Sequence, residues 1–123
     1  MKYSRLALSA FAVLALCGAS SAGREPRLMS GHYRIRWEEQ SFVLCGSSAR
    51  WWVADPGDLA AHWREHVDGD YGEVFATVRA DVTDEGMYGH LGMYPRSIAV
   101  REVLEVSAAK DGDCRDAARR TTE

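Results

Sequence analysis

Three side chains with soft or borderline donor atoms recur in one glycine-rich stretch. Met87, His90 and Met93 supply two thioethers and an imidazole at a spacing of three residues, and these are ligands that suit Cu(I). The glycines around them would allow the three side chains to converge on one ion. The alternative is a loop in which Met87 and Met93, with Tyr88, Leu91 and Tyr94, fold over one end of a barrel. The sequence leaves both interpretations open.

A pair of histidines lies in a predicted helix. His62 and His66 are four residues apart, so both imidazoles would lie on one helix face. The sequence between them is not the His-Glu-x-x-His arrangement of zinc proteases, and we expect a solvated helix face. A nucleophilic serine motif and a phosphate-binding glycine loop are also missing. The sequence therefore predicts a protein that is not an enzyme.

Aromatic residues offer another way to bind a partner. Trp51 and Trp52 are adjacent in a predicted strand, so their side chains must point to opposite faces of the sheet. One of the two is therefore expected at the surface. Together with Tyr88 and Tyr94 they form the predicted binding surface, on which a protein or a glycan could stack.

The N-terminal segment has the features of a secretory signal peptide in their usual order. Lys2 and Arg5 precede an apolar stretch at 6–18, and small residues follow at 19–22. We predict cleavage after Ala22 and a periplasmic or secreted protein. A membrane-spanning helix is the alternative, but the apolar stretch is short for a bilayer.

Cys17 raises the question of a lipid anchor. Lipidation of this cysteine would attach the protein to a membrane, which is the only way in which we expect a membrane contact. The bulky Leu16 immediately before it disfavours that form of processing.

The other two cysteines limit the compartment and the fold. Cys45 and Cys114 form an even pair once Cys17 is removed, and in an exported chain such a pair indicates a disulfide. The bond would close a loop of about 69 residues, which the chain-entropy model values at about 4 kcal/mol. A redox or metal-binding pair is the alternative, but the Cys-x-x-Cys spacing is missing.

Alternating polar and apolar residues predict five strands and one short helix. The predicted strands are 31–37, 41–45, 50–53, 73–83 and 97–106, and the helix covers about 59–67. The alternation at 73–83 suits a long, curved barrel strand. In the last strand Ile98, Val100, Leu104 and Val106 are in phase, and the break at 101–103 indicates a bulge or an edge.

These elements predict a mainly β fold, a small five-stranded OB-like Greek-key barrel with one short helix, stapled by a disulfide. A lipocalin-like or sandwich fold is the alternative. We assign 1–22 to the signal peptide, 23–30 to a short linker, 31–114 to the barrel and 115–123 to a disordered tail.

Size and charge exclude several classes of protein. The chain has 123 residues and a formal charge of −3, too short for a large two-domain enzyme and too acidic for a nucleic-acid binder. Lys110 is the only lysine beyond the predicted signal peptide. We therefore expect no nucleic-acid partner.

Several of these residues resemble the C-terminal OB domain of NlpE-type envelope lipoproteins. The similar features are Phe42-x-x-Cys45-Gly46, Trp52 ahead of a helix holding Leu59, Gly72-Glu73-Val74 at the start of a long strand, the strand 100–104 and Cys114. The resemblance covers about residues 31–114. It implies an exported, disulfide-closed OB barrel linked to envelope stress and surface-adhesion signalling, with a connection to copper and no catalytic residues.

Taken together, the sequence predicts a non-catalytic exported interaction module, related to envelope stress, that binds an envelope protein or a glycan without a cofactor. The alternative is a periplasmic copper-binding protein that uses Met87, His90 and Met93.

Overall fold

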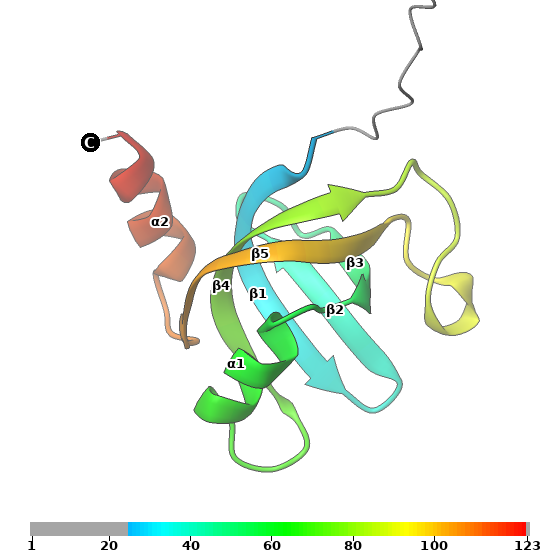
Figure 1. Cartoon of the computed structure of the whole chain (residues 1–123), viewed down its shortest axis with the longest axis horizontal. Helices are drawn as coiled ribbons and strands as arrows, with labels where there is room; N and C mark the ends of the chain where they lie inside the picture. The colour runs from blue at the N-terminus through cyan, green and yellow to red at the C-terminus, as the bar shows by residue number, and fades with distance from the viewer. Residues whose placement is uncertain (1–24, 123) are drawn as a thin grey trace, which may run out of the picture.

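The computed structural model describes residues 25–122, so the predicted signal peptide, its cleavage site and Cys17 lie outside the described residues. In chain order the elements are β1 (Arg27–Arg36), β2 (Glu39–Leu44), β3 (Arg50–Asp55), α1 (Leu59–His66), β4 (Gly72–Val82), a 3-10 turn (His90–Gly92), β5 (Ser97–Ala108) and α2 (Asp113–Thr122) (Figure 1). None of the helices within 25–122 is long and apolar enough to span a membrane.

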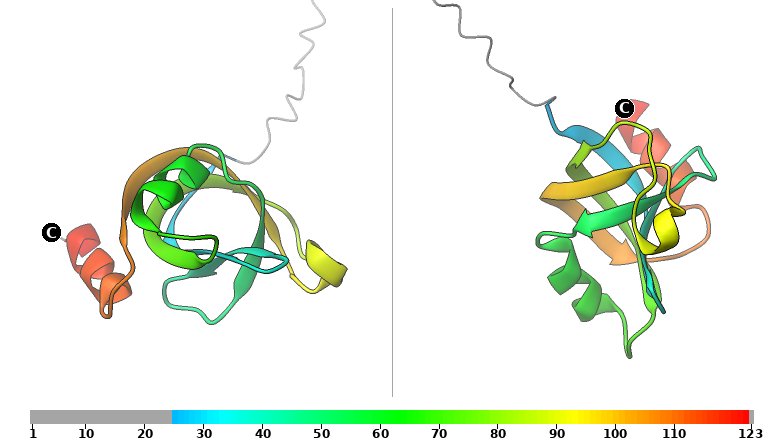
Figure 2. Two further views of the ribbon diagram at one scale, coloured as in Figure 1. Left: turned by 90° about the horizontal axis from the view of Figure 1, so that it is seen from below. Right: turned by 90° about the vertical axis from the view of Figure 1, so that its right-hand side faces the viewer.

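The five strands pair in the order β1-β2-β3-β5-β4, and β4 pairs with β1 again, so the sheet closes on itself. Every pairing is antiparallel except that of β3 with β5, which is parallel and covers only a few residues. Looking along the barrel, α1 lies across one end of the ring of strands (Figure 2). Leu59 and Trp63 are the buried residues of this helix and join the core.

Alternate positions of the strands fill the interior. On β4, Val74, Ala76, Val78 and Ala80 are fully buried, as the period of two along the strand requires. At Gly31 the neighbouring strand comes so close that a Cβ would lie 2.2 Å from the carbonyl oxygen of Val43. Only glycine therefore allows β1 and β2 to approach each other at this point.

The mainly β architecture, its five strands and the helix between β3 and β4 are confirmed. The predicted hairpin of 41–45 with 50–53 is also present, as β2 and β3. Residues 27–30, assigned to the linker, instead form the start of β1, where Met29 is buried and pairs with Val78. Ser30 and Gly31 interrupt the apolar pattern, which hid this part of the strand.

The polar segment after Cys114 was expected to be disordered, and this prediction is wrong for 115–122. These residues form most of α2, whereas Glu123 lies outside the described residues. Asp113 and Asp116 occupy the first turn, and Arg119 and Arg120 the last. Both sets of charges complement the helix dipole.

The predicted bulge in β5 is confirmed, but it changes the phase of the strand. The register against β4 shifts at two places, which leaves Arg101 and Leu104 without a partner in the ladder. Each extra residue reverses the alternation of faces. Leu104 is therefore 47% exposed, and Val103 packs against the core instead, contrary to the predicted phase.

Candidate functional site

Two loops meet at one side of the barrel. The tight β1–β2 turn contains Trp37 and Glu38, and the β4–β5 loop covers 83–96. A polar contact of 2.9 Å between the Nε2 atom of His90 and the Oε2 atom of Glu38 joins them. The β4–β5 loop stands beside the β1–β2 turn in both views of Figure 2.

The β4–β5 loop is held in one conformation by its own hydrogen bonds. Tyr88 and Tyr94 form an isolated antiparallel bridge, with N–H···O distances of 2.9 and 3.1 Å. The amide of Gly86 donates to the carbonyl of Pro95, and the hydroxyl of Tyr88 donates to the carbonyl of Asp84. The glycine-rich stretch is therefore an ordered small hairpin.

Trp52 fixes this hairpin to the barrel. The side chain points outward from β3, and the ring of Tyr94 lies against it with centroids 5.3 Å apart. A Cβ on Gly89 would lie 2.4 Å from the Cδ2 atom of Trp52, so the loop backbone rests directly on the indole. Trp52 is thus the outward member of the tandem pair, but the loop covers it.

A pocket of about 330 Å³ lies beside Tyr94. The pocket beside Tyr94 is lined by Ser48, Arg50, His90, Met93 and Tyr94. Arg50 Nη1 lies 3.0 Å from the Oε1 atom of Glu39. Burial, and then the charge of Glu39, raise the pKa of the Tyr94 phenol, while Arg50 lowers it. The phenol is therefore a neutral hydrogen-bonding group at neutral pH.

Four large apolar side chains are exposed on these two loops. We call Trp37, Met87, Leu91 and Met93 the loop patch; their exposed fractions are 76%, 80%, 78% and 74%. His90 and Met93 share the pocket wall, and Met87 lies against Gly92. Exposed apolar side chains that gather on one surface are typical of an interaction site.

Backbone strain is concentrated at the same place. Among the described residues, Glu38 and Leu91 are the two non-glycine residues with positive φ, 52° and 56°. This left-handed conformation costs a non-glycine residue about 1–2 kcal/mol, and such strain occurs preferentially at ligand-binding and catalytic sites. Glu38 contacts His90, and Leu91 follows His90 directly in the chain.

The structure brings only some residues of the predicted aromatic surface together. Trp51 is 8% exposed and lies in the core, so its assignment to the binding surface is wrong. The guanidinium groups of Arg27 and Arg96 lie 5.6 and 5.8 Å from its ring. Trp52 and Tyr94 are adjacent, and Tyr88 belongs to the loop scaffold.

The predicted copper ligands are only partly brought together. His90 and Met93 line one pocket, whereas Met87 is not part of its wall. Within 25–122, no group of three or more His, Cys, Asp or Glu side chains is arranged to hold a metal ion. Copper binding by Met87, His90 and Met93 stays a prediction.

Sequence reasoning missed the role of the β1–β2 turn. The predicted strand at 31–37 included Trp37, but β1 ends at Arg36 and the tryptophan is exposed in the turn. The pair Glu38-Glu39, which interrupts the alternation, was the available signal for this turn. Its contacts with His90 and Arg50 depend on the tertiary fold and leave no trace in the sequence.

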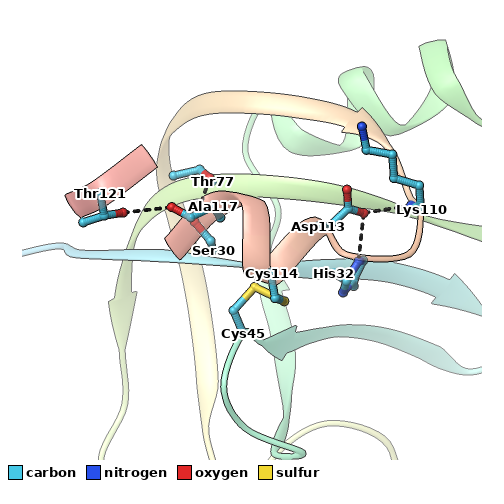
Figure 3. The surroundings of a disulfide bond; sticks show 9 residues. All are labelled: Ser30, His32, Cys45, Thr77, Lys110, Asp113, Cys114, Ala117 and Thr121. Atoms are coloured by element: carbon cyan, nitrogen blue, oxygen red, sulfur yellow. Dashed lines mark hydrogen bonds and ion pairs between the residues drawn. A yellow bond between two sulfur atoms is a disulfide. The ribbon is translucent and has the colours of Figure 1, made fainter. Parts of the chain in front are cut away.

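The disulfide between Cys45 and Cys114 is confirmed, with its Cα atoms 5.2 Å apart. It ties the end of β2 to the first turn of α2 (Figure 3). A disulfide of this kind is typical of an oxidising compartment outside the cytosol.

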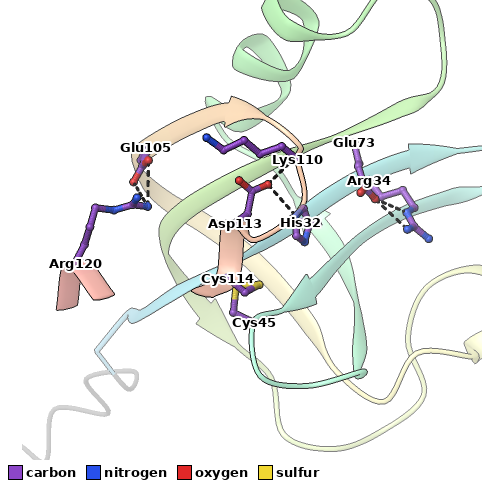
Figure 4. A network of polar contacts seen from close by, with 9 residues as sticks. All are labelled: His32, Arg34, Cys45, Glu73, Glu105, Lys110, Asp113, Cys114 and Arg120. Carbon is purple, nitrogen blue, oxygen red and sulfur yellow. Dashed lines mark hydrogen bonds and ion pairs between the residues drawn. A yellow bond between two sulfur atoms is a disulfide. The ribbon is translucent and has the colours of Figure 1, made fainter. Parts of the chain in front are cut away.

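Polar contacts beside the disulfide attach the C-terminal segment to the barrel (Figure 4). The buried Asp113 carboxylate accepts a hydrogen bond from the amide of Lys110, at 2.8 Å, and lies 3.3 Å from His32 Nε2. His32 packs edge-on against Phe75, an outward-facing residue of β4 that is only 1% exposed. A pocket of about 480 Å³ lies here, lined by His32, Glu73 and 109–115. These contacts serve to dock α2.

The comparisons with known proteins find no match: no family model, no curated protein and no solved structure matches this chain. The resemblance to NlpE-type OB domains therefore stays a prediction, and the function must be argued from the site itself.

Proposed function

We propose that this protein is an exported, non-catalytic interaction module that binds another envelope protein through the loop patch and the adjoining pocket. The observation that carries the proposal is the exposure of Trp37, Met87, Leu91 and Met93 on two loops that the contact of His90 with Glu38 joins. Burying these side chains against a partner would supply the main favourable free energy of binding.

The fold supports the choice of this surface. We assign the barrel to the OB type on its strand order, the parallel pairing of β3 with β5, and the helix between β3 and β4. OB barrels use the face of strands 2 and 3 and the loops between strands 1 and 2 and between 4 and 5 to bind ligands. These elements supply the pocket and the loop patch.

A protein partner fits the site better than a glycan. Sugar binding commonly uses an open aromatic face, but Gly89 covers the indole of Trp52. The side chains that remain exposed are flexible thioethers, a leucine and a tryptophan, and methionine-rich surfaces adapt well to polypeptides. Through the resemblance to NlpE-type lipoproteins, the proposal extends to a role in envelope stress.

A capture experiment tests the proposal. We expect the immobilised chain to retain a defined protein from an envelope extract, and the double variant Trp37→Ser, Met93→Ser to lose it. Tyr71→Ser is the matched control because Tyr71 is 55% exposed and lies outside the loop patch. Equal retention by all three chains, or no retained protein, would contradict the proposal.

The second candidate is a copper-handling protein, favoured by the position of His90 and Met93 in one pocket wall. A competition titration against a Cu(I) chelator tests it. We expect submicromolar binding that is lost in the double variant His90→Ala, Met93→Ala. Binding no tighter than micromolar would exclude this function.

A further inference from the structure

We propose that the C-terminal segment 109–122 is a redox-sensitive cap on the outside of the barrel. Reduction of the Cys45–Cys114 disulfide by a dithiol reductant releases this cap, while the five strands stay folded. The inference is independent of the loop patch and of the function proposed above.

The cap runs along the outer face of β1 and β4. Residues 109–115 border a pocket with His32 of β1, and α2 borders a second pocket with Leu28 of β1 and Thr77 of β4. Phe75 lies between these two places on β4, opposite His32 in the register, and it is only 1% exposed although it faces outward. The cap therefore covers an apolar side chain on the outside of the barrel.

Little packing attaches the cap to this face. Pockets of about 480 and 190 Å³ lie between the cap and the strands. Within α2, all of which the structure describes, Asp113 is the only buried residue. A polar helix of 10 residues is marginally stable on its own. Its individual bonds to the barrel must therefore supply most of what keeps it in place.

The disulfide is the strongest of these bonds (Figure 3). It connects Cys114, in the first turn of α2, with Cys45, which follows β2 directly. In the described part of the chain, the other polar contacts of α2 with the barrel are that of Asp113 with β1, at 3.3 Å, and an ion pair of Arg120 with Glu105, at 3.4 Å. An ion pair as exposed as the second one contributes little stability.

The barrel closes without the disulfide. β5 ends at Ala108, whose partner on β4 is Val74. Cys114 lies six residues beyond this end of the sheet, counted from 108 to 114. Breaking the bond between the sulfur atoms therefore frees 109–122 and removes no pairing between strands.

The disulfide is accessible to a reductant in the folded protein. Both cysteines are partly exposed, and Cys114 belongs to the wall of the pocket of about 480 Å³. A thiolate of the reductant attacks one sulfur, forms a mixed disulfide with it and displaces the other sulfur as a thiolate, which takes up a proton. The second thiol of the reductant then resolves the mixed disulfide. The products are two cysteine thiols and the oxidised, cyclic reductant.

The released cap can dock again. The six residues that lead from Ala108 to Cys114 span about 20 Å at most, so the thiol of Cys114 stays near that of Cys45. This proximity gives the two thiols a high effective concentration. Oxidation should therefore re-form the bond and return the cap to its place.

The rate of reduction by dithiothreitol tests the inference, with the natural chain and Leu59→Ala compared. Leu59 is fully buried and belongs to α1, away from the disulfide. We expect a rate that rises in proportion to the dithiothreitol concentration and agrees within about twofold in the two chains. If the bond were reduced only after the barrel unfolds, Leu59→Ala would react at least about thirtyfold faster, because truncating a buried leucine raises the unfolded population by that factor. That result would overturn the inference.

Hydrogen exchange on the natural chain supplies a second measurement that needs no variant. After reduction, exchange should become fast at 111–122 and stay slow in β1 and β4, and reoxidation should restore the protection of α2. Loss of protection in β4 would show that the barrel itself depends on the disulfide. Continued protection of α2 in the reduced chain would show that other contacts hold the cap. Either result would overturn the inference.

Discussion

Gly89 shows how a residue without a side chain sets the position of the β4–β5 loop. In Gly89→Ala, the new Cβ would lie 2.4 Å from the Cδ2 atom of Trp52, and φ is +69°. The loop must therefore move away from the indole. We expect a loss of unfolding free energy of about 2–4 kcal/mol, the sum of backbone strain and lost packing, and a changed environment of Trp52 in near-ultraviolet circular dichroism.

Gly46→Ala is the matched control for this prediction. Gly46 also has a positive φ, +78°, but a Cβ there would meet no atom within 4 Å. It should therefore cost only the backbone strain of about 1–2 kcal/mol and leave the circular dichroism of the tryptophans unchanged. Equal losses in the two variants would show that the contact of Gly89 with Trp52 contributes nothing.

Tyr33 is a second residue whose surroundings have a measurable effect. Burial raises the pKa of its phenol to about 12, a shift that Arg64 opposes in part, and the hydroxyl donates to Gln40 Oε1 at 3.1 Å. The folded protein thus favours the neutral phenol. This contribution to stability is complete below the ordinary pKa of 10.0 and is lost as the pH rises from about 10 to about 12.

Alkaline denaturation measures this effect. We expect the free energy of unfolding to fall between about pH 10 and pH 12 by on the order of 2 kcal/mol. The decrease should be smaller in Tyr33→Phe, which has no phenol to ionise at this position. An identical alkaline decrease in both chains would show that other groups cause it.

At the scale of elements, the sequence predicts best where burial follows a simple period. The alternation of β4 and the hairpin of β2 with β3 were predictable because one face of each strand is in the core. α2 was not, because its residues are polar and its buried residue is an aspartate. It is held by Asp113 and the disulfide, which depend on β1 and β2.

The docking of α2 yields a prediction of its own. In the double variant Cys45→Ser, Cys114→Ser, we expect the free energy of unfolding to fall by about 2–5 kcal/mol. Since α2 is otherwise attached by Asp113 and by the exposed Arg120–Glu105 pair, it should detach first. Hydrogen exchange should become fast at 113–122 and stay slow in β4. Uniform loss of protection would contradict this order of unfolding.

The sequence predicts several residues of the site, but not how these residues are arranged in space. Tyr94, His90 and Met93 were candidates for binding, and the structure places them together at one pocket. For Trp51 and Trp52 the sequence predicts only that the two side chains point to opposite faces of the sheet. It does not show which of them faces the core. The contribution of Glu38 arises from a contact between loops that are far apart in the chain.

At the scale of the whole molecule, closure of the barrel depends on how closely β1 and β2 approach each other. In Gly31→Ala, the added Cβ would lie 2.2 Å from the carbonyl oxygen of Val43 and 2.7 Å from Cε1 of Phe42. A backbone oxygen cannot move without disturbing the ladder, and β1 also pairs with β4 along most of its length. The strain therefore reaches every strand through the closed sheet.

We expect Gly31→Ala to destabilise the protein by at least about 3 kcal/mol, more than ordinary overpacking of a core, because backbone atoms are involved. Unfolding should remain a single transition in circular dichroism and tryptophan fluorescence. Ser30→Ala, the neighbouring change on the outer face of β1, removes only a 2.7 Å hydrogen bond to Thr77 and should cost about 1 kcal/mol. An equal loss of unfolding free energy in Gly31→Ala and Ser30→Ala would contradict this prediction. It would show that β1 and β2 can separate locally, and that closure of the barrel does not hold the loops they carry.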